Sequence, residues 1–364
     1  MRRVLKNWFS DLVMAFRSEC KDIIGDAGVL IFFLVLPLAY PLVYTMIYNP
    51  EVVTDLPIAV VDNSRTEQSR SLARSANASS AIKIYDYCNN MADAKRLMAE
   101  RKVFGIMEIP ADYSRNLVRG EQTVVPFYAE MSLLLRYRTM LTTLTDLQLS
   151  VIDSNSLPIE NSNHFLGNPS QGFASFVMPG ILILIIQQSM VIGICTIAGT
   201  ARERRRRLRG SASAAVWGKT LCYVVLYIPL TLYAVHIVPM IFNLPHIGRP
   251  TDYLPFLLPM LFASAMFGQT LSVLCKERES SFFVVVISSI LFIFLSGLTW
   301  PRYAMSTFFV WLGNLIPSTW GVNGFILINT NAATLSDVIR PYPILWILTI
   351  LYSITATITT KTRK

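Results

Sequence analysis

The residues with the most evident chemistry form one basic run, Arg202-Glu203-Arg204-Arg205-Arg206-Arg207-Leu208-Arg209. Guanidinium groups at this density attract the headgroups of anionic lipids. The run follows a charge-free stretch, residues 172–201, that is long enough to cross a bilayer, and residues 220–242 form a second such stretch. A dense cationic loop between two spans marks the cytoplasmic side of a membrane. We therefore expect a cytoplasmic partner to bind at this run.

Three glutamines are the strongest candidates for a translocation path, because no Asp, Glu, Lys or Arg lies clearly inside a span. Gln187 and Gln188 lie in the first charge-free stretch, and Gln269 lies in a later one. The alternative is that these side chains are hydrogen-bonding contacts between helices, and the two interpretations weigh equally. Carriers driven by protons or ions usually need charged groups near the midplane, so the energy source is expected to lie elsewhere.

The signals of catalysis are weak. Residues 213–220 (SAAVWGKT) approach a phosphate-binding loop, but Ser213 replaces its first glycine and no strand precedes it. The histidines, His164, His236 and His246, lie far apart in the sequence and form no evident catalytic group. The five cysteines show no paired spacing. We expect no catalytic residue, no disulfide, no metal site and no cofactor in this chain.

The composition excludes a soluble protein. Only 15% of the 364 residues are charged, against about 25% in globular domains, and the apolar residues come in blocks of roughly span length. The net charge is +9. The excess of basic residues lies outside residues 50–172, at the edges of the apolar blocks, where anionic lipid explains it without any nucleic acid.

Six transmembrane helices are expected, at residues 27–48, 173–200, 217–242, 253–275, 281–298 and 342–359. Basic residues concentrate in the N-terminal stretch, in the loop 201–219 and in the C-terminal tail, which places both termini in the cytoplasm. Residues 1–26 are predicted to form an amphipathic helix in the inner interface. The alternative is a cytosolic extension of the first span, residues 27–49, but Gly25-Asp26 breaks the pattern.

Residues 297–341, within the C-terminal region 173–364, are unlike an ordinary loop. They combine tryptophans with Gly297, Pro301 and Pro317, and their apolar runs are too short to cross a bilayer. A re-entrant pair of half-helices at the outer end of the bundle fits this pattern, because irregular backbone at membrane depth must be buried in protein. These three residues are the candidates for an outer gate.

Residues 50–172 are expected to form a small extracytoplasmic α/β domain. Ser64 is the predicted N-cap of its first helix, with Glu67 in the capping box, and Gly120 is predicted to end its third. Residues 153–170 are rich in Asn and Ser and are predicted to tether the domain to the membrane. Strands are predicted at 57–62, 82–87, 103–109 and 123–129, and helices at 64–76, 93–101, 112–119 and 133–152.

The layout resembles the permease subunit of type-2 ABC exporters, in the drug-export-like branch with a large extracytoplasmic domain. The resemblance covers nearly the whole chain and rests on the order of several short motifs. They are the helix with Arg17, Glu19 and Asp26 before Leu36-Pro37, segments 58–64 and 103–110, Tyr113-Ser114, Arg202-Glu203-Arg204 before Gly218-Lys219, Leu295-Ser296-Gly297 before Pro301, and Pro317-Ser318-Thr319. Family members usually continue from the glutamate into a Gly-Thr/Ser turn, whereas Arg205 to Leu208 stand here and Gly210 comes late.

The resemblance implies two six-span subunits, as a homodimer or with a paralogue, around a path for the substrate. Each subunit would dock a separate cytoplasmic ABC ATPase, which carries the ATP and Mg²⁺. Closure of the ATPases would move the docked elements as levers and drive a hydrophobic or amphipathic, drug-like or lipid-like substrate outward across the cytoplasmic (inner) membrane of a bacterium. The implied ATPase contacts are Arg202, Glu203, Arg204, Arg206, Arg207 and Gly210, with Glu277 and Arg278 as a smaller second contact.

Two other classes remain open, a non-transporting receptor and an envelope-assembly scaffold, each acting through the extracytoplasmic domain. Neither needs an ATPase, so dependence on an ATPase partner separates them from the exporter. The basic run also has a second interpretation, a topology signal and lipid anchor alone. Membrane lipids are partners in every case, and a periplasmic adaptor is left open.

Overall fold

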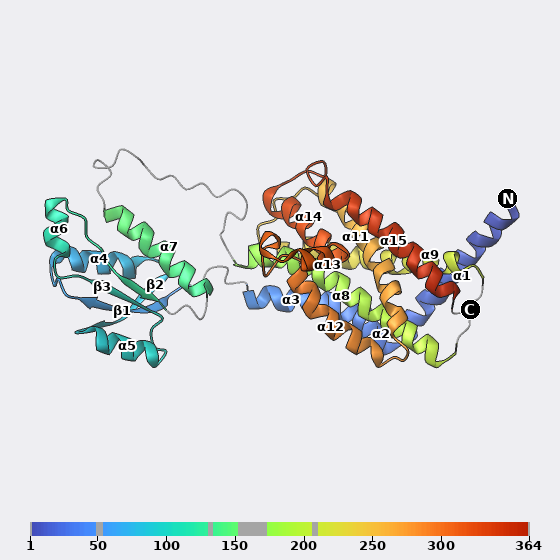
Figure 1. The fold of residues 1–364 in the computed structure, drawn as a ribbon, viewed down its shortest axis with the longest axis horizontal. Helices are drawn as coiled ribbons and strands as arrows, with labels where there is room; N and C mark the ends of the chain where they lie inside the picture. Colours follow the sequence, from blue (N-terminus) through green and yellow to red (C-terminus); the bar gives the residue numbers. More distant parts are fainter. Residues whose placement is uncertain (1, 49–53, 130–133, 152–172, 206–209, 363–364) are drawn as a thin grey trace. The chain divides into compact units, whose positions relative to one another are not determined.

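The computed structural model describes residues 2–48, 54–129, 134–151, 173–205 and 210–362. The chain divides into two compact units, a helical unit made of Met1–Glu51 and Phe165–Lys364 and an α/β unit made of Val52–His164 (Figure 1). The predicted extracytoplasmic domain, residues 50–172, overlaps the α/β unit. The predicted tether, residues 153–170, lies outside the described residues.

The α/β unit is built on a four-stranded sheet with the order β2-β1-β3-β4. β1 pairs in parallel with β2 and β3, and β4 is antiparallel to β3. The four residues from Ile58 to Val61 in β1 are almost fully buried, as residues of a strand covered on both faces must be. The strands are β1 (Leu56–Asp62), β2 (Ile82–Cys88), β3 (Gly105–Ile109) and β4 (Phe127–Ala129).

Helices cover both faces of this sheet (Figure 1). They are α4 (Glu67–Ala78), α5 (Met91–Ala99), α6 (Tyr113–Arg119) and α7 (Leu134–Val151). Leu72 of α4 and Met140 of α7 pack on the face that carries Ile58 and Val60, whereas α5 packs on the opposite face through Ala94. Neighbouring residues of a strand point to opposite faces, so β1 contributes to two separate cores.

The first helix of the α/β unit is capped two residues later than predicted. Thr66, and not Ser64, is the N-cap of α4. The Thr66 hydroxyl accepts a hydrogen bond from the Ser69 amide (3.3 Å), and the Ser69 hydroxyl accepts one from the Thr66 amide (3.0 Å). Ser69 therefore stands in the capping box where Glu67 was expected. The shift arises because the Asp62 carboxylate accepts a hydrogen bond from the Ser64 amide (3.0 Å) and closes a turn ahead of the helix.

The last strand is shorter than predicted, whereas the third helix ends as predicted. β4 begins at Phe127 rather than at Thr123, because Pro126 has no amide hydrogen to donate to the sheet. The Pro126 carbonyl still accepts a hydrogen bond from the Glu108 amide (3.0 Å). Gly120 ends α6 with a left-handed backbone, at a φ of 67°.

Among the described residues, five helices of the helical unit are long and apolar enough to cross a membrane. A sixth apolar helix, α12 (Ser280–Leu295), corresponds to the predicted span 281–298; its 16 residues are fewer than the roughly 20 of an ordinary span. The count of six spans therefore stays a prediction. The five are α2 (Ala27–Leu30) with η1 (Ile31–Val35) and α3 (Leu36–Tyr48), α8 (Phe173–Glu203), α9 (Ala212–Leu232) with η2 (Tyr233–Ile237) and α10 (Val238–Ile241), α11 (Pro250–Leu271) with η3 (Ser272–Leu274), and α15 (Pro341–Lys361).

α8 is the core of the helical unit. In its most apolar stretch 78% of the residues are buried, against 22% for the span that begins with α2. It contacts α3, α11, α12 and α14 (Pro317–Asn331), which lie around it (Figure 1). A further long helix, α1 (Arg2–Ile24), precedes the first span, and Gly25-Asp26 separates the two as predicted.

Prolines account for two widened turns, η1 and η2, which are π-helical. Pro37 follows four residues after the centre of η1, and Pro239 follows four residues after the centre of η2. A proline cannot donate to the carbonyl four residues earlier, and its ring would collide with that carbonyl, so the preceding turn widens. Phe33, at the centre of η1, is fully buried and packs on the rings of Tyr223 (5.5 Å between centroids) and Tyr227 (5.8 Å).

The segment 297–341 contains two short helices, α13 (Thr307–Asn314) and α14. Of the predicted gate residues, Gly297 has a φ of 87°, Pro301 precedes a single 3-10 turn, and Pro317 is the first residue of α14. The pair of short helices agrees with the predicted pattern. Their re-entrant placement and their role as a gate stay predictions.

Replacing Thr66 with alanine should lower the free energy of unfolding of the α/β unit by about 1 kcal/mol, because the N-cap hydrogen bond of α4 is lost. Ser64→Ala is the matched control and should cost less, since Ser64 does not cap the helix. Pulse proteolysis of the full-length protein in urea measures both values. A larger loss for Ser64→Ala than for Thr66→Ala would contradict the observed cap and favour the predicted one.

Candidate functional site

The candidate site begins with the contact between α1 and α9. Gly218 of α9 permits this contact, because a side chain there would come within 2.4 Å of the Leu12 carbonyl oxygen. At the start of α9, the Ser211 amide donates a hydrogen bond to the Asp11 carboxylate (2.7 Å). The two helices are therefore held together at close range by backbone as well as side chains.

A buried carboxylate fixes α1 to α9 about two turns further along both helices. The Glu19 side chain is only 3% exposed, and its carboxylate pairs with the Lys219 ammonium at 2.8 Å. The Tyr223 hydroxyl donates a second hydrogen bond to the same carboxylate. A buried carboxylate that loses its partners is strongly destabilising, so α1 is expected to stay on α9 rather than detach.

The break between α1 and the first span carries the next ion pair. The Asp26 carboxylate caps α2 by accepting hydrogen bonds from the Gly28 amide (3.0 Å) and the Val29 amide (3.2 Å). The Arg278 guanidinium donates to both carboxylate oxygens, at 2.6 and 2.9 Å. These hydrogen bonds from Arg278 hold the pKa of Asp26 below its ordinary value, and the same pairing raises the pKa of Arg278.

The end of α8 is tied to the turn between α11 and α12. The Glu203 carboxylate accepts a hydrogen bond from the Arg278 amide (2.7 Å). The Arg202 guanidinium donates to the carbonyl oxygens of Ser272 and Cys275. Asp26, Arg202, Glu203 and Arg278 are together named the loop junction, because they join the start of the first span, the end of α8 and the start of α12.

The residues predicted to contact an ATPase fall into two groups. Three of them, Arg202, Glu203 and Arg278, make contacts within the loop junction. Arg204 and Glu277 are exposed beside it. Gly210 has a φ of 83° and faces Asp11 of α1, where a side chain would collide with the carboxylate. Arg206 and Arg207 lie outside the described residues. The ATPase contact itself stays a prediction.

The three glutamines hold helices together. Gln187 of α8 is fully buried, and its amide bonds to Ser318 at the start of α14 through both the Ser318 amide (2.6 Å) and the Ser318 hydroxyl (2.9 Å). Gln269 of α11 donates to the Thr220 hydroxyl of α9 (2.6 Å). Gln188 donates to a backbone carbonyl of α12 (3.0 Å), and its own side-chain oxygen is buried without a partner among the described residues. These contacts favour the packing interpretation, and a translocation path stays a prediction.

Two of the three histidines lie together, which their sequence positions did not indicate. The ring centroids of His236 and His246 are 5.7 Å apart, and the Tyr253 hydroxyl is 3.0 Å from the His236 Nδ1. Burial lowers the pKa of His246. Within the described residues, no group of three or more His, Cys, Asp or Glu could hold a metal ion, and the five cysteines are unpaired in disulfides. His164 lies outside the described residues.

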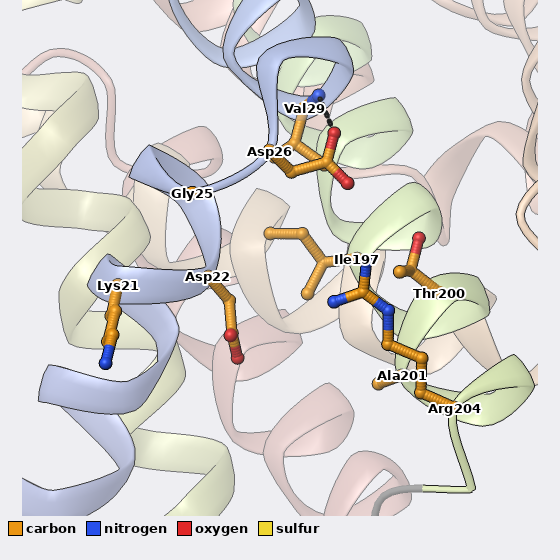
Figure 2. Close-up of a pocket in the computed structure, with 9 residues that line it drawn as sticks. All are labelled: Lys21, Asp22, Gly25, Asp26, Val29, Ile197, Thr200, Ala201 and Arg204. Carbon is orange, nitrogen blue, oxygen red and sulfur yellow. Dashed lines mark hydrogen bonds between the residues drawn. The ribbon is translucent and has the colours of Figure 1, made fainter.

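A cavity of about 180 Å³ lies beside the loop junction, between the end of α1 and the end of α8 (Figure 2). Val29 and Ile197 form the apolar wall of the cavity. Besides Asp26 of the loop junction, the charged residues of the lining are Lys21, Asp22 and Arg204. Figure 2 shows the Arg204 side chain extending from the end of α8 towards α1. The cavity therefore combines an apolar side with a charged side.

The fold and these contacts define a multi-pass helical membrane protein with an α/β insertion and a loop junction at one end of its spans. A sequence model described as ABC-2 family transporter protein matches residues 27–358, so the chain belongs to this family. It is a permease subunit of an ABC transporter, and its family implies partnership with an ABC ATPase subunit. No curated protein matches the chain.

Replacing Asp26 with asparagine should destabilise the protein at neutral pH by roughly 1 kcal/mol or less, because Arg278 is partly exposed and its pairing is screened. Asparagine still caps α2, so the change isolates the ion pair. The pKa of Asp26 is depressed below 3.8 in the folded protein. Its stabilisation is therefore complete above that value and is lost as the pH falls through the folded pKa.

The melting temperature of the purified protein, compared between wild type and variant at pH 7 and below pH 3.8, checks this expectation. The difference should be present at pH 7 and shrink in acid. Glu279→Gln is the control, since Glu279 is exposed next to Arg278. This substitution should leave the melting temperature unchanged at both pH values. Equal melting of wild type and Asp26→Asn at pH 7 would show that the ion pair contributes nothing.

Proposed function

We propose that this chain is the permease subunit of an ATP-driven exporter that moves a hydrophobic or amphipathic, drug-like or lipid-like substrate outward. The membership in the ABC-2 family carries this proposal. The spans support the substrate class, because no charged side chain lies clearly inside them to bind a charged solute. Hydrolysis belongs to the partner ATPase with its ATP and Mg²⁺, and this chain supplies the path.

The proposed setting is the cytoplasmic (inner) membrane of a bacterium, with both termini in the cytoplasm. The concentration of basic residues in the N-terminal stretch, the arginine run and the C-terminal tail supports this orientation. The loop junction then faces the cytoplasm, and the α/β unit lies on the opposite side, where a periplasmic adaptor could bind it.

The loop junction is the proposed coupling element. Asp26 lies just after the end of α1, and Glu203 is the last residue of α8. Arg278 donates hydrogen bonds to the carboxylates of both residues. A displacement of any one of these segments is therefore passed to the other two. The exposed Arg204 and Glu277, with Arg206 and Arg207 of the same loop, are the proposed surface for the ATPase.

The proposed assembly contains two permease subunits, either two copies of this chain or this chain with a paralogue. One face of α12 supports such an arrangement. Its side chains Phe283, Ile287 and Phe294 are more than half exposed, although the helix is strongly apolar. Lipid covers such a face equally well, so the second subunit is an outcome that the experiment below decides.

Co-purification of the chain from its native membrane, with ATPase activity measured on whatever accompanies it, tests the proposed function. A stoichiometric soluble ATPase whose activity responds to apolar compounds is the expected result. The mass of the intact complex gives the number of permease subunits. A chain that remains without an ATPase after gentle crosslinking would instead favour a receptor or an envelope scaffold that acts through the α/β unit.

Replacing Glu203 with alanine should lower the stimulation of the partner ATPase by substrate several-fold, because the end of α8 loses its hydrogen bond to the Arg278 amide. Glu203→Gln keeps an acceptor oxygen and should retain most of the stimulation. Glu279→Ala is a control for the loss of a neighbouring exposed carboxylate. The measurement is ATPase activity of the reconstituted complex, with membrane insertion checked for each variant. Full stimulation in Glu203→Ala would remove Glu203 from the coupling element.

A further inference from the structure

Arg302, in the segment that joins α12 to α13, has a guanidinium group held in place by neutral groups. It donates a hydrogen bond to the side-chain oxygen of Asn314 and lies over the Trp320 ring, 5.2 Å from the ring centroid. Its aliphatic stem crosses Gly297, where a side chain would come within 2.7 Å of it. The guanidinium group is therefore fixed on one side and surrounded by no charge of its own segment.

No carboxylate neutralises Arg302. Among the described residues it forms no ion pair. Two acidic residues elsewhere in the helical unit, Asp252 and Asp337, accept hydrogen bonds from the backbone amides of Leu335 (3.0 Å) and Thr334 (2.8 Å) instead. Arginine is only rarely withdrawn from water without an anion, because desolvation of an unpaired charge is costly.

Part of the Arg302 side chain is open to a ligand. The residue is half-buried, and in the described part of the chain its side chain donates to no acceptor except Asn314. None of its nitrogen atoms is a buried donor without a partner, so its remaining N–H groups are accessible. Such a fork of N–H groups binds phosphate or carboxylate oxygens with charge-assisted hydrogen bonds.

The neighbours of Arg302 are attached to α8 well below the outer end of that helix in the proposed orientation. Leu298 packs on Gly180, about 10 Å along α8 from Phe173, and Gln187, which binds Ser318, is about 21 Å along it. α8 is about 46 Å long, close to a bilayer with both headgroup layers. When α8 crosses the membrane as proposed, these contacts lie deeper than the outer headgroup layer.

An ionisable residue at membrane depth is costly and marks a path or a binding site. Arg302 is a single cation beside spans that carry no charge clearly inside them, so it matches one anionic group on an otherwise apolar molecule. A highly charged solute would find no further partner there. The same arrangement explains why the cation is held by an aromatic ring and an amide, which leave its charge available.

We propose that Arg302 binds the anionic group of an amphiphile, and that the exported substrate is an apolar molecule with one phosphate or carboxylate group. This inference rests on the proposed function for the direction of export and for the depth of the segment. Binding by Arg302 itself needs neither the ATPase nor transport, so it can be measured separately.

The first test is binding of oleoyl lysophosphatidic acid to the full-length chain in a neutral detergent, followed by thermophoresis. Monooleoylglycerol has the same acyl chain without the phosphate, and glycerol 3-phosphate has the phosphate without the chain. Both should bind more weakly than lysophosphatidic acid. Arg302→Gln should weaken binding of lysophosphatidic acid roughly tenfold, because a hydrogen-bonded charge is lost.

Asn314→Asp provides a second variant that retains the cation. It supplies the missing carboxylate next to Arg302 and should also weaken binding of lysophosphatidic acid. Arg340→Gln is the control, since it removes an exposed cation at the start of α15 and should leave binding unchanged. Unchanged binding in either Arg302→Gln or Asn314→Asp overturns the proposal. Glycerol 3-phosphate that binds as well as lysophosphatidic acid assigns Arg302 to a free anion and also overturns it.

The second test separates a substrate from a resident lipid. In the complex with the ATPase, lysophosphatidic acid should stimulate hydrolysis more than monooleoylglycerol does, and Arg302→Gln should remove the difference. Equal stimulation by the two compounds in the wild type overturns the substrate claim and leaves export untouched. Phosphatidylglycerol that binds more tightly than lysophosphatidic acid, without stimulation by either, identifies a resident lipid and overturns the claim. No stimulation by any amphiphile, charged or neutral, overturns the proposed function as well.

Discussion

The arrangement of the helical unit at one end of its spans depends on the pairing of Arg278 with Asp26. The two residues are 252 positions apart, and the bidentate geometry leaves neither carboxylate oxygen without a donor. The Arg278 backbone adds the contact to Glu203, so side chain and main chain of one residue hold two different segments. Because the pair is partly buried, salt screens it less than it screens an exposed pair.

A second set of contacts gives α1 its place independently of that pair. The buried Glu19, with Lys219 and Tyr223 around it, fixes α1 on α9, while the loop junction fixes the end of α1 on α8 and α12. α1 is therefore fixed by two separate sets of contacts, one to α9 and one at the loop junction. In the proposed exporter, this double attachment would pass a displacement from a docked ATPase into the spans.

The parts of this structure that could be predicted from the sequence are those set by short-range rules. Apolar length locates spans, because the backbone of a spanning helix must satisfy its own hydrogen bonds. The alternation of strands and helices in the α/β unit follows from the same kind of local pattern. The cap of α4 was misplaced because Ser64, Thr66 and Ser69 stand within six positions of one another and all of them can cap a helix. Only the Asp62 turn decides among them.

The contacts of the loop junction could not be predicted in the same way, because each partner is a common surface residue and the pairing depends on how distant helices pack. The break at Gly25-Asp26 was visible, but nothing in it names Arg278 as the partner of Asp26. The same holds for the glutamines, whose two interpretations the sequence left equal. Gln187 reaches Ser318 across 131 positions, and only the folded bundle brings them together.

That contact between Gln187 and Ser318 has a consequence for how the protein is made. The amide of Ser318 belongs to the first turn of α14, where the helix has no hydrogen-bond acceptor of its own. A newly synthesised α14 that has not yet packed on Gln187 has an unpaired amide donor, and such a group is costly to place in an apolar environment. α8 is synthesised well before α14, since Gln187 and Ser318 are 131 positions apart. The first turn of α14 therefore obtains its side-chain acceptor from a helix that is made earlier in the chain.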